Sequence, residues 1–174
     1  MPDSNNIPDR RILFIPHALA VTVPVGEIGY ACHPARLLTP ALGSCVGVAI
    51  WDPLLRTGAL SHVMLPSLGD GLSAQDSKYA TFAIPQMIER MVENGSPRRR
   101  LQAKIAGGAA MFSRDTGVAS IGDRNVEEVK RQLVLMHVAL LAEDTGQRHA
   151  RTIELVLDTG ILLVHSHHNG TREI

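Results

Sequence analysis

The cysteine at position 45 is the first residue whose surroundings in this sequence indicate chemistry. It lies in "LGSCVGVAIWD", where Gly43, Cys45 and Gly47 form a Gly-x-Cys-x-Gly pattern. The pattern fits either a nucleophile on a tight turn or a small apolar residue in a buried strand. A hydrolase elbow needs a helix after the nucleophile, whereas "VGVAIW" is typical of a strand. The context after Cys45 therefore excludes that elbow although the pattern matches, and the pattern alone favours a structural cysteine.

A catalytic thiol also needs a base that removes its proton. Among eight histidines, His62 lies in "LSHVMLP", an apolar segment that we expect to pair with the strand after Cys45. A third group should orient the imidazole. Thr39, six residues before Cys45, is one candidate. Asp52 is another, but its position at the far end of the strand and before a proline favours a turn residue.

The elements that would carry these side chains follow from periodicity and turn residues. Strands are expected at 20–31, 35–43, 45–52, 59–66, 101–108, 137–144 and 151–166, the last as a hairpin. The strand at 45–52 shows little polar alternation, which predicts cover on both faces.

Two helices are expected, over 76–93 and from Asn125 to about Met136. Pro85 predicts a kink or a restart in the first, which should end at Gly95. Asn125, with Glu128 three residues later, resembles a capping arrangement in the second. Because strands outnumber helices and hairpins predominate, we predict a single-domain α+β layered fold with mainly antiparallel or mixed sheets.

The composition limits the class of partner. Lys plus Arg and Asp plus Glu number 17 each in 174 residues, so the formal net charge is zero. This balance gives no reason to expect nucleic acid or an acidic membrane surface as a partner. No apolar run is long enough to span a bilayer, so we expect no membrane insertion and a cytoplasmic location. There, both cysteines would be thiols.

Several long segments, in order, resemble the chemoreceptor glutamine deamidase (CheD) family of bacterial and archaeal chemotaxis. The resemblance covers most of the chain, from about Val25 to Val164. It is carried by "GEIGYA", "LTPALGSCVGVAIWDP", "GALSHVMLP", "KYA", "LQAKIAGGAAMF", "IGDRNVEEVKRQL" and "LLAEDTG".

The resemblance implies a layered α/β/β sandwich with a Cys-His-Thr active site formed by Cys45, His62 and Thr39. It implies a cysteine thioester mechanism that converts glutamine side chains on the cytoplasmic domain of chemotaxis receptors to glutamate, without metal or cofactor. Some members also act on glutamate methyl esters, and some are bound by a CheC-type phosphatase. Pro40–Ala41 replaces the glycine-containing step more usual in the family, a change that could shift Thr39.

We assign residues 1–18 to a loose N-terminal extension, 19–165 to the deamidase domain and 166–174 to a flexible tail. One alternative function is a non-catalytic binding module that regulates a CheC-type phosphatase. Another is a metal site at His165, His167 and His168, although no carboxylate or cysteine accompanies them at ligand spacing. Three motif roles also stay open. The segment "AGGAAMF" either lines the site or forms a tight structural loop. In "IGDRN", Arg124 or Asn125 supports the site, or Asn125 only caps its helix.

Overall fold

The computed structural model describes residues 20–68, 76–111 and 118–174, so the expected N-terminal extension lies outside the described residues. The helices are α1 (Ala80–Glu93), α2 (Ile121–Leu135) and the short 3-10 helix η1 (Arg98–Arg100). The strands are β1 (Ala20–Thr22), β2 (Ile28–Cys32), β3 (Arg36–Leu42), β4 (Val46–Asp52), β5 (Thr57–Val63), β6 (Gln102–Gly107), β7 (Ala139–Thr145), β8 (Arg151–Val156), β9 (Leu162–Ser166) and β10 (Gly170–Glu173).

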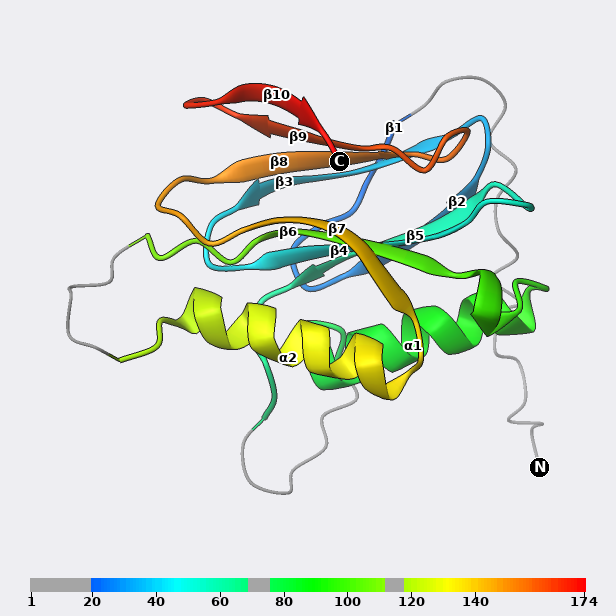
Figure 1. Cartoon of the computed structure of the whole chain (residues 1–174), viewed down its shortest axis with the longest axis horizontal. Coiled ribbons are helices and arrows are strands. Elements are labelled where there is room, and N and C mark those ends of the chain that lie inside the picture. The colour runs from blue at the N-terminus through cyan, green and yellow to red at the C-terminus, as the bar shows by residue number, and fades with distance from the viewer. Residues whose placement is uncertain (1–19, 69–75, 112–117) are drawn as a thin grey trace, which may run out of the picture.

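These elements form three layers (Figure 1). The two long helices cover one face of a central sheet with strand order β2-β5-β4-β6-β7. Its other face packs on an outer sheet with order β1-β3-β8-β9-β10, and an apolar core fills each side of the central sheet. Both sheets are mixed, because β1 pairs with β3 and β6 pairs with β7 in parallel. The predicted α+β fold with α/β/β layers is therefore confirmed.

Strand β4 lies in the middle of the central sheet, which explains its continuous apolar sequence. Val46, Val48 and Ile50 belong to the core beneath the helices, whereas Ala49 and Trp51 contact the core on the outer-sheet side. Side chains alternate between the faces of a strand, so both faces of β4 are apolar because both are covered. The predicted cover on both faces is confirmed.

Strands β4 and β5 form the predicted antiparallel hairpin, with Gly47 opposite His62. A Cβ at position 47 would lie 2.3 Å from Ile153 Cδ1 and 2.8 Å from Leu42 Cδ1, both on the outer sheet. Only glycine lets the two sheets approach this closely here. The second glycine of Gly-x-Cys-x-Gly therefore serves sheet packing and does not form a nucleophile elbow.

Helix α1 begins four residues after the expected start and continues through Pro85 without interruption, so the restart expected there does not occur. A proline at this position removes one main-chain hydrogen bond. Burial of the apolar face offsets that loss, since the buried residues are Ala80, Ala83, Ile84, Met87, Ile88 and Met91.

Helix α2 is capped by residues other than those predicted. Ser120 is the N-cap, and its Oγ accepts from the Asp123 N–H at 3.1 Å, while Asp123 Oδ2 accepts from the Ser120 N–H at 2.9 Å. This capping box begins five residues before Asn125, which is buried inside the helix. The cap predicted at Asn125 is therefore wrong.

The segment expected to be a flexible tail contains β10, which pairs antiparallel with β9 and places Thr171 opposite His165. The domain boundaries themselves stay a prediction.

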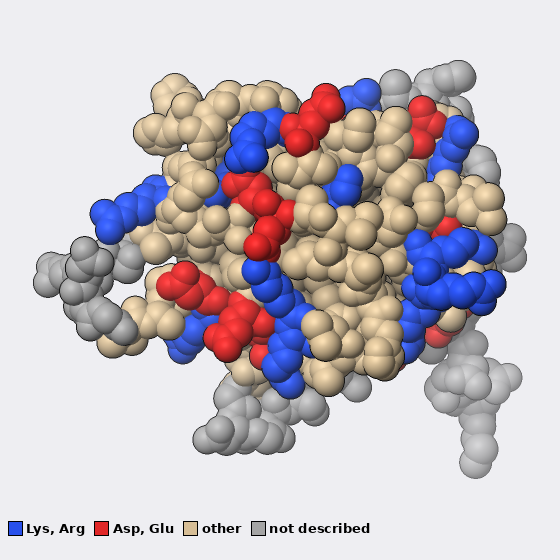
Figure 2. All heavy atoms as spheres, in the orientation of Figure 1, with Lys and Arg blue, Asp and Glu red and all other residues tan. Residues whose placement is uncertain are grey.

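On the face in Figure 2, acidic and basic side chains are interspersed, and Lys and Arg gather where β6 begins, beside η1. Within the described ranges, no helix combines the length and hydropathy needed to cross a membrane.

Candidate active site

Thr39 and His62 meet between the two sheets, at the end of the hairpin where β4 begins. Thr39 comes from β3 of the outer sheet and His62 from β5 of the central sheet, and both are buried. The Thr39 hydroxyl oxygen lies 2.7 Å from His62 Nδ1 and 2.8 Å from the backbone carbonyl oxygen of Val23. One hydroxyl therefore links the imidazole to the outer-sheet side of the core.

This hydroxyl fixes the position of the proton on the neutral His62 ring. A carbonyl oxygen can only accept, so the Thr39 hydroxyl proton is directed to Val23. The hydroxyl oxygen must then accept from His62, which places the ring proton on Nδ1. Nε2 keeps a free lone pair, the state that a general base requires. Because Val23 acts through its backbone, its residue type carried no signal of this role.

Cys45 lies directly before β4 and two residues from Gly47, the ladder partner of His62. Alternation along a strand places positions 45 and 47 on one face, the face that His62 shares. Cys45 accordingly packs against the core on the outer-sheet side, where Thr39 also lies. The structure thus brings Cys45 and His62 to the same end and the same face of the hairpin.

Cys45 and His62 are nevertheless not hydrogen-bonded to each other in this state. His62 Nε2 is buried and has no hydrogen-bond partner within the part of the chain that the structure describes. Catalytic hydrogen bonds are commonly long without substrate and tighten when it binds. The geometry therefore leaves Nε2 free to accept a proton.

Burial acts on both groups in the direction that favours their neutral forms. It raises the pKa of the Cys45 thiol above its ordinary value and lowers the pKa of His62 below its ordinary value. Both shifts favour a thiol and a neutral imidazole over a thiolate–imidazolium ion pair.

Within "AGGAAMF", whose last residue lies outside the described residues, Gly107, Gly108 and Ala109 pack directly against the residues around Cys45. Gly108 N–H donates to Cys45 O and Ala109 N–H donates to Gly43 O, both at 2.8 Å. Gly107 has φ 108°, and a Cβ there would lie 2.3 Å from Cys45 O. Paired glycines thus permit a close backbone approach that holds the cysteine segment from one side.

The departure at Pro40–Ala41 is absorbed without displacing Thr39 from His62. The β3–β8 register shifts between Thr39 and Leu42, and Ala41 has φ 59°, in the left-handed region. The irregularity therefore begins after Thr39, whose ladder partner is still Ile153.

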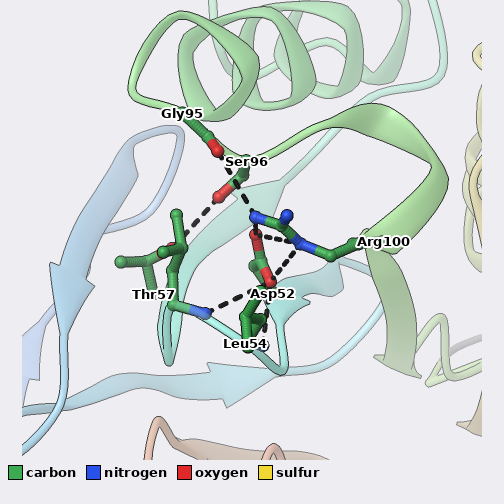
Figure 3. Close-up of polar contacts among 7 residues, drawn as sticks. Asp52, Leu54, Thr57, Gly95, Ser96 and Arg100 are labelled. Carbon is green, nitrogen blue, oxygen red and sulfur yellow. Dashed lines mark hydrogen bonds and ion pairs between the residues drawn. The ribbon is translucent and has the colours of Figure 1, made fainter.

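Asp52, the rival candidate for orienting His62, lies at the other end of the hairpin (Figure 3). Its carboxylate accepts from Arg100 Nη2 at 2.7 Å and from the Leu54 N–H at 3.0 Å. Asp52 lies five positions along β4 from Gly47, the partner of His62, which corresponds to about 17 Å. Asp52 closes the turn, as predicted, and cannot contact His62.

Of the two supports left open in "IGDRN", the structure favours Asn125. Arg124 is exposed on α2. The Asn125 amide Nδ2 donates to Ser44 O and to Met64 O, each at 2.9 Å. The residue is thus bonded to the segments that carry Cys45 and His62.

The tail histidines make contacts of another kind. His165 Nδ1 lies 2.8 Å from Thr171 Oγ1, and the His149 and His168 rings are 5.6 Å apart between centroids. Among the described residues, no group of three His, Cys, Asp or Glu side chains is arranged to hold a metal ion.

Comparison with known proteins identifies the family. The family model "CheD chemotactic sensory transduction" matches residues 64–166. A chemoreceptor glutamine deamidase CheD from Thermotoga maritima is 44% identical over 142 residues, which are 82% of this chain and 88% of the relative. A probable chemoreceptor glutamine deamidase CheD from Syntrophomonas wolfei is 39% identical over 157 residues, covering 88% and 98% of the two chains.

Among solved structures, the hypothetical protein YfiH from Bacillus licheniformis is similar with a TM-score of 0.48 and 13% identity, over 75% of this chain and 60% of that one. The family model begins at residue 64 and covers both long helices and strands β6 to β9. This chain belongs to the CheD family.

Proposed function

We propose that this chain deamidates glutamine side chains of chemotaxis receptors, with Cys45 as nucleophile, His62 as general base and Thr39 as the residue that orients His62. One observation carries the proposal: the Thr39 hydroxyl lies between Val23 O and His62 Nδ1, which leaves a buried, unprotonated Nε2 beside the cysteine segment. The names of the relatives supply the reaction and the substrate class.

The reaction starts from the neutral pair. His62 Nε2 takes the thiol proton while Cys45 Sγ attacks the carboxamide carbon of the substrate glutamine, so a carbon–sulfur bond forms and the carbonyl oxygen becomes an oxyanion. Backbone N–H groups around Cys45 would stabilise this oxyanion. Thr39 holds the ring in place as the imidazolium forms, because Nδ1–H stays bonded to its hydroxyl.

Collapse of the tetrahedral intermediate breaks the carbon–nitrogen bond, and the His62 imidazolium gives its proton to the departing nitrogen, which leaves as ammonia. The remaining thioester is attacked by water, from which His62 removes a proton. The thiol of Cys45 is then released together with a glutamate side chain. Each cycle adds one negative charge to the receptor. The same steps with methanol as leaving group would give the accessory glutamate methylesterase activity.

Removing the nucleophile tests the proposal. The full chain is incubated with a receptor cytoplasmic fragment, and ammonia release is measured with the mass change of receptor peptides in which an amide NH₂ becomes OH. Cys45→Ala should lower kcat by at least about 10⁴-fold, as loss of a nucleophile does in other acyl-transfer enzymes. Cys32→Ala is the matched control, because Cys32 lies opposite Thr57 at the other end of the hairpin.

Equal rates for Cys45→Ala and wild type would overturn the assignment of the nucleophile. An inactive wild-type protein that binds a CheC-type phosphatase tightly would instead support the alternative of a non-catalytic regulatory module. His62→Ala run in parallel tests the base, and full activity in that variant would reject it.

A further inference from the structure

Asn125 is a polar residue on the buried face of α2, and both protons of its amide nitrogen are used to bind backbone carbonyls. Nδ2 donates to Ser44 O and to Met64 O, each at 2.9 Å, and the residue is fully buried. Ser44 immediately precedes Cys45, and Met64 is two residues after His62. A single side chain thus bridges the segment of the nucleophile and the segment of the base.

The bridge lies where backbone pairing between these two segments stops. The β4–β5 ladder ends with Val46 opposite Val63, so Ser44 and Met64 lie beyond the last ladder pair. The Met64 N–H is directed away from β4 and donates to Lys78 O at 2.9 Å. Asn125 therefore supplies across the hairpin the connection that main-chain hydrogen bonds supply along the rest of it.

The cysteine segment has three successive backbone carbonyls, each held by a different donor. Backbone N–H groups of Ala109 and Gly108 hold Gly43 O and Cys45 O, as described above. Ser44 O, between them, is held by the Asn125 side chain. Of these three bonds, this is the one that a side-chain substitution removes directly.

Burying the Asn125 amide costs free energy, which indicates that its two hydrogen bonds have a specific role. Asn125 Oδ1 is buried without a hydrogen-bond partner among the described residues, and such unpaired buried acceptors are rare in folded proteins. An apolar side chain would avoid that cost, but it would leave two carbonyl oxygens unpaired.

We propose that Asn125 is a positioning residue that holds Cys45 in register with His62. Because Asn125 is buried, it acts through the two backbone segments and does not touch the substrate. Loss of the bridge should let the Cys45 segment move relative to β5, and a misplacement of about 1 Å is enough to lower a rate about 10²-fold. The expected loss in kcat rests on the proposed function.

The test compares Asn125→Ala with Gln132→Ala in the full-length protein. Gln132 is a buried amide on the same helix, and its side chain donates to Glu128 Oε1, remote from the cysteine. Asn125→Ala should lower kcat for receptor deamidation about 10²-fold with little change in KM, whereas Gln132→Ala should leave both near wild type. Asn125→Ser, which keeps a hydroxyl donor, should be intermediate and replaces the alanine variant if that one does not fold.

A second readout does not depend on the proposed reaction. Iodoacetamide labelling of each cysteine, followed by mass spectrometry, should show faster modification of Cys45 in Asn125→Ala than in wild type, because the loosened segment is more accessible. Cys32 on β2 is the internal control, and its rate should stay unchanged. The proposal thus predicts that Cys45 reacts faster with the reagent while catalysis slows.

The outcomes separate the two hypotheses. Unchanged Cys45 labelling and unchanged kcat in Asn125→Ala would overturn the positioning role. Faster labelling of both cysteines would also overturn it, since that result indicates general unfolding. If wild type shows no deamidation, the proposed function fails, and selective labelling of Cys45 in Asn125→Ala still supports the bridge.

Discussion

The two ends of the β4–β5 hairpin differ in whether their buried polar atoms have hydrogen-bond partners. At the turn end, the Asp52 carboxylate accepts from Arg100 and from the backbone N–H of Leu54, as Figure 3 shows. It also accepts from the backbone N–H of Leu55. Burial by itself would raise the pKa of Asp52, but these hydrogen bonds hold it below its ordinary value. The buried carboxylate at the turn end is therefore charged, and its oxygens have hydrogen-bond partners.

The other end of the hairpin carries neutral groups whose hydrogen-bond acceptor atoms have no partner among the described residues. His62 Nε2 and Asn125 Oδ1 are both buried without partners among the described residues. Unpaired buried groups reduce stability, so each calls for an explanation. For His62 Nε2 the proposed explanation is proton transfer from the thiol, and for Asn125 it is the bridge between the two backbone segments. This difference supports the proposal that the Asp52 end stabilises the hairpin and that the Cys45 end carries the chemistry.

Asp52→Ala should give the largest effect on stability. It removes the partner of Arg100 and the acceptor of two turn N–H groups, and we expect the free energy of unfolding to fall by about 3 kcal/mol. The value is at the low end for a broken buried pair because Arg100 is partly exposed and can be hydrated. Chemical denaturation measures the loss, and kcat at a temperature where the variant is folded should be unchanged.

Arg36→Ala is the control for that variant, because the Arg36–Glu154 pair is exposed on the arginine side. Its effect on stability should be much smaller, as is usual for solvated pairs. A large fall in kcat for Asp52→Ala at unchanged stability would contradict the division between the two ends.

Thr39→Val tests the chemical end with an almost isosteric change. Valine cannot accept from His62 Nδ1 or donate to Val23 O, so the tautomer and the orientation of the ring are no longer fixed. We expect kcat to fall about 10²-fold, equivalent to about 2.7 kcal/mol. Thr39→Ser keeps the hydroxyl and should retain most of the activity. Equal rates for the two variants would show that the hydroxyl has no orienting role.

Local pattern was sufficient to predict the hairpin and the layered class. The turn residues between β4 and β5 and the apolar runs on either side predicted that His62 would lie near the Cys45 strand, and the register shows Gly47 opposite His62. Cover on both faces of β4 followed from its lack of alternation. These features depend on residues close together in the sequence.

The contacts between layers were not predictable in the same way. Nothing in the spacing of Thr39 indicates that β3 crosses above His62, because that contact depends on how two sheets stack. The role of Asn125 was equally hidden, since Asn three residues before Glu also fits a helix cap. The Ser120–Asp123 box was the stronger signal for the helix start, and it would have left Asn125 free for another role.

The pH dependence of Cys45 reactivity should give the smallest but most direct distinction between the two ends. In Cys32→Ser, where Cys45 is the remaining cysteine, alkylation by iodoacetamide should increase through an apparent pKa above the ordinary value of a cysteine thiol, because burial raises the pKa of Cys45. A thiolate–imidazolium pair would instead react at a nearly constant rate into the acid range, and that profile would contradict a neutral resting pair.

Folding stability should reflect the same two groups, with opposite signs. Burial lowers the pKa of His62, so the unfolded chain binds its proton more readily, and the contribution of this residue to stability falls as the pH drops below 6.5. Burial raises the pKa of Cys45, so the unfolded chain releases that proton more readily, and stability falls as the pH rises above 9.0. His62→Gln should reduce the loss of stability on the acid side, and Cys45→Ala should reduce the loss on the alkaline side. If the pH dependence of the unfolding free energy does not change in one of these variants, the substituted group is not neutral in the folded protein. The contrast with the charged Asp52 end then fails.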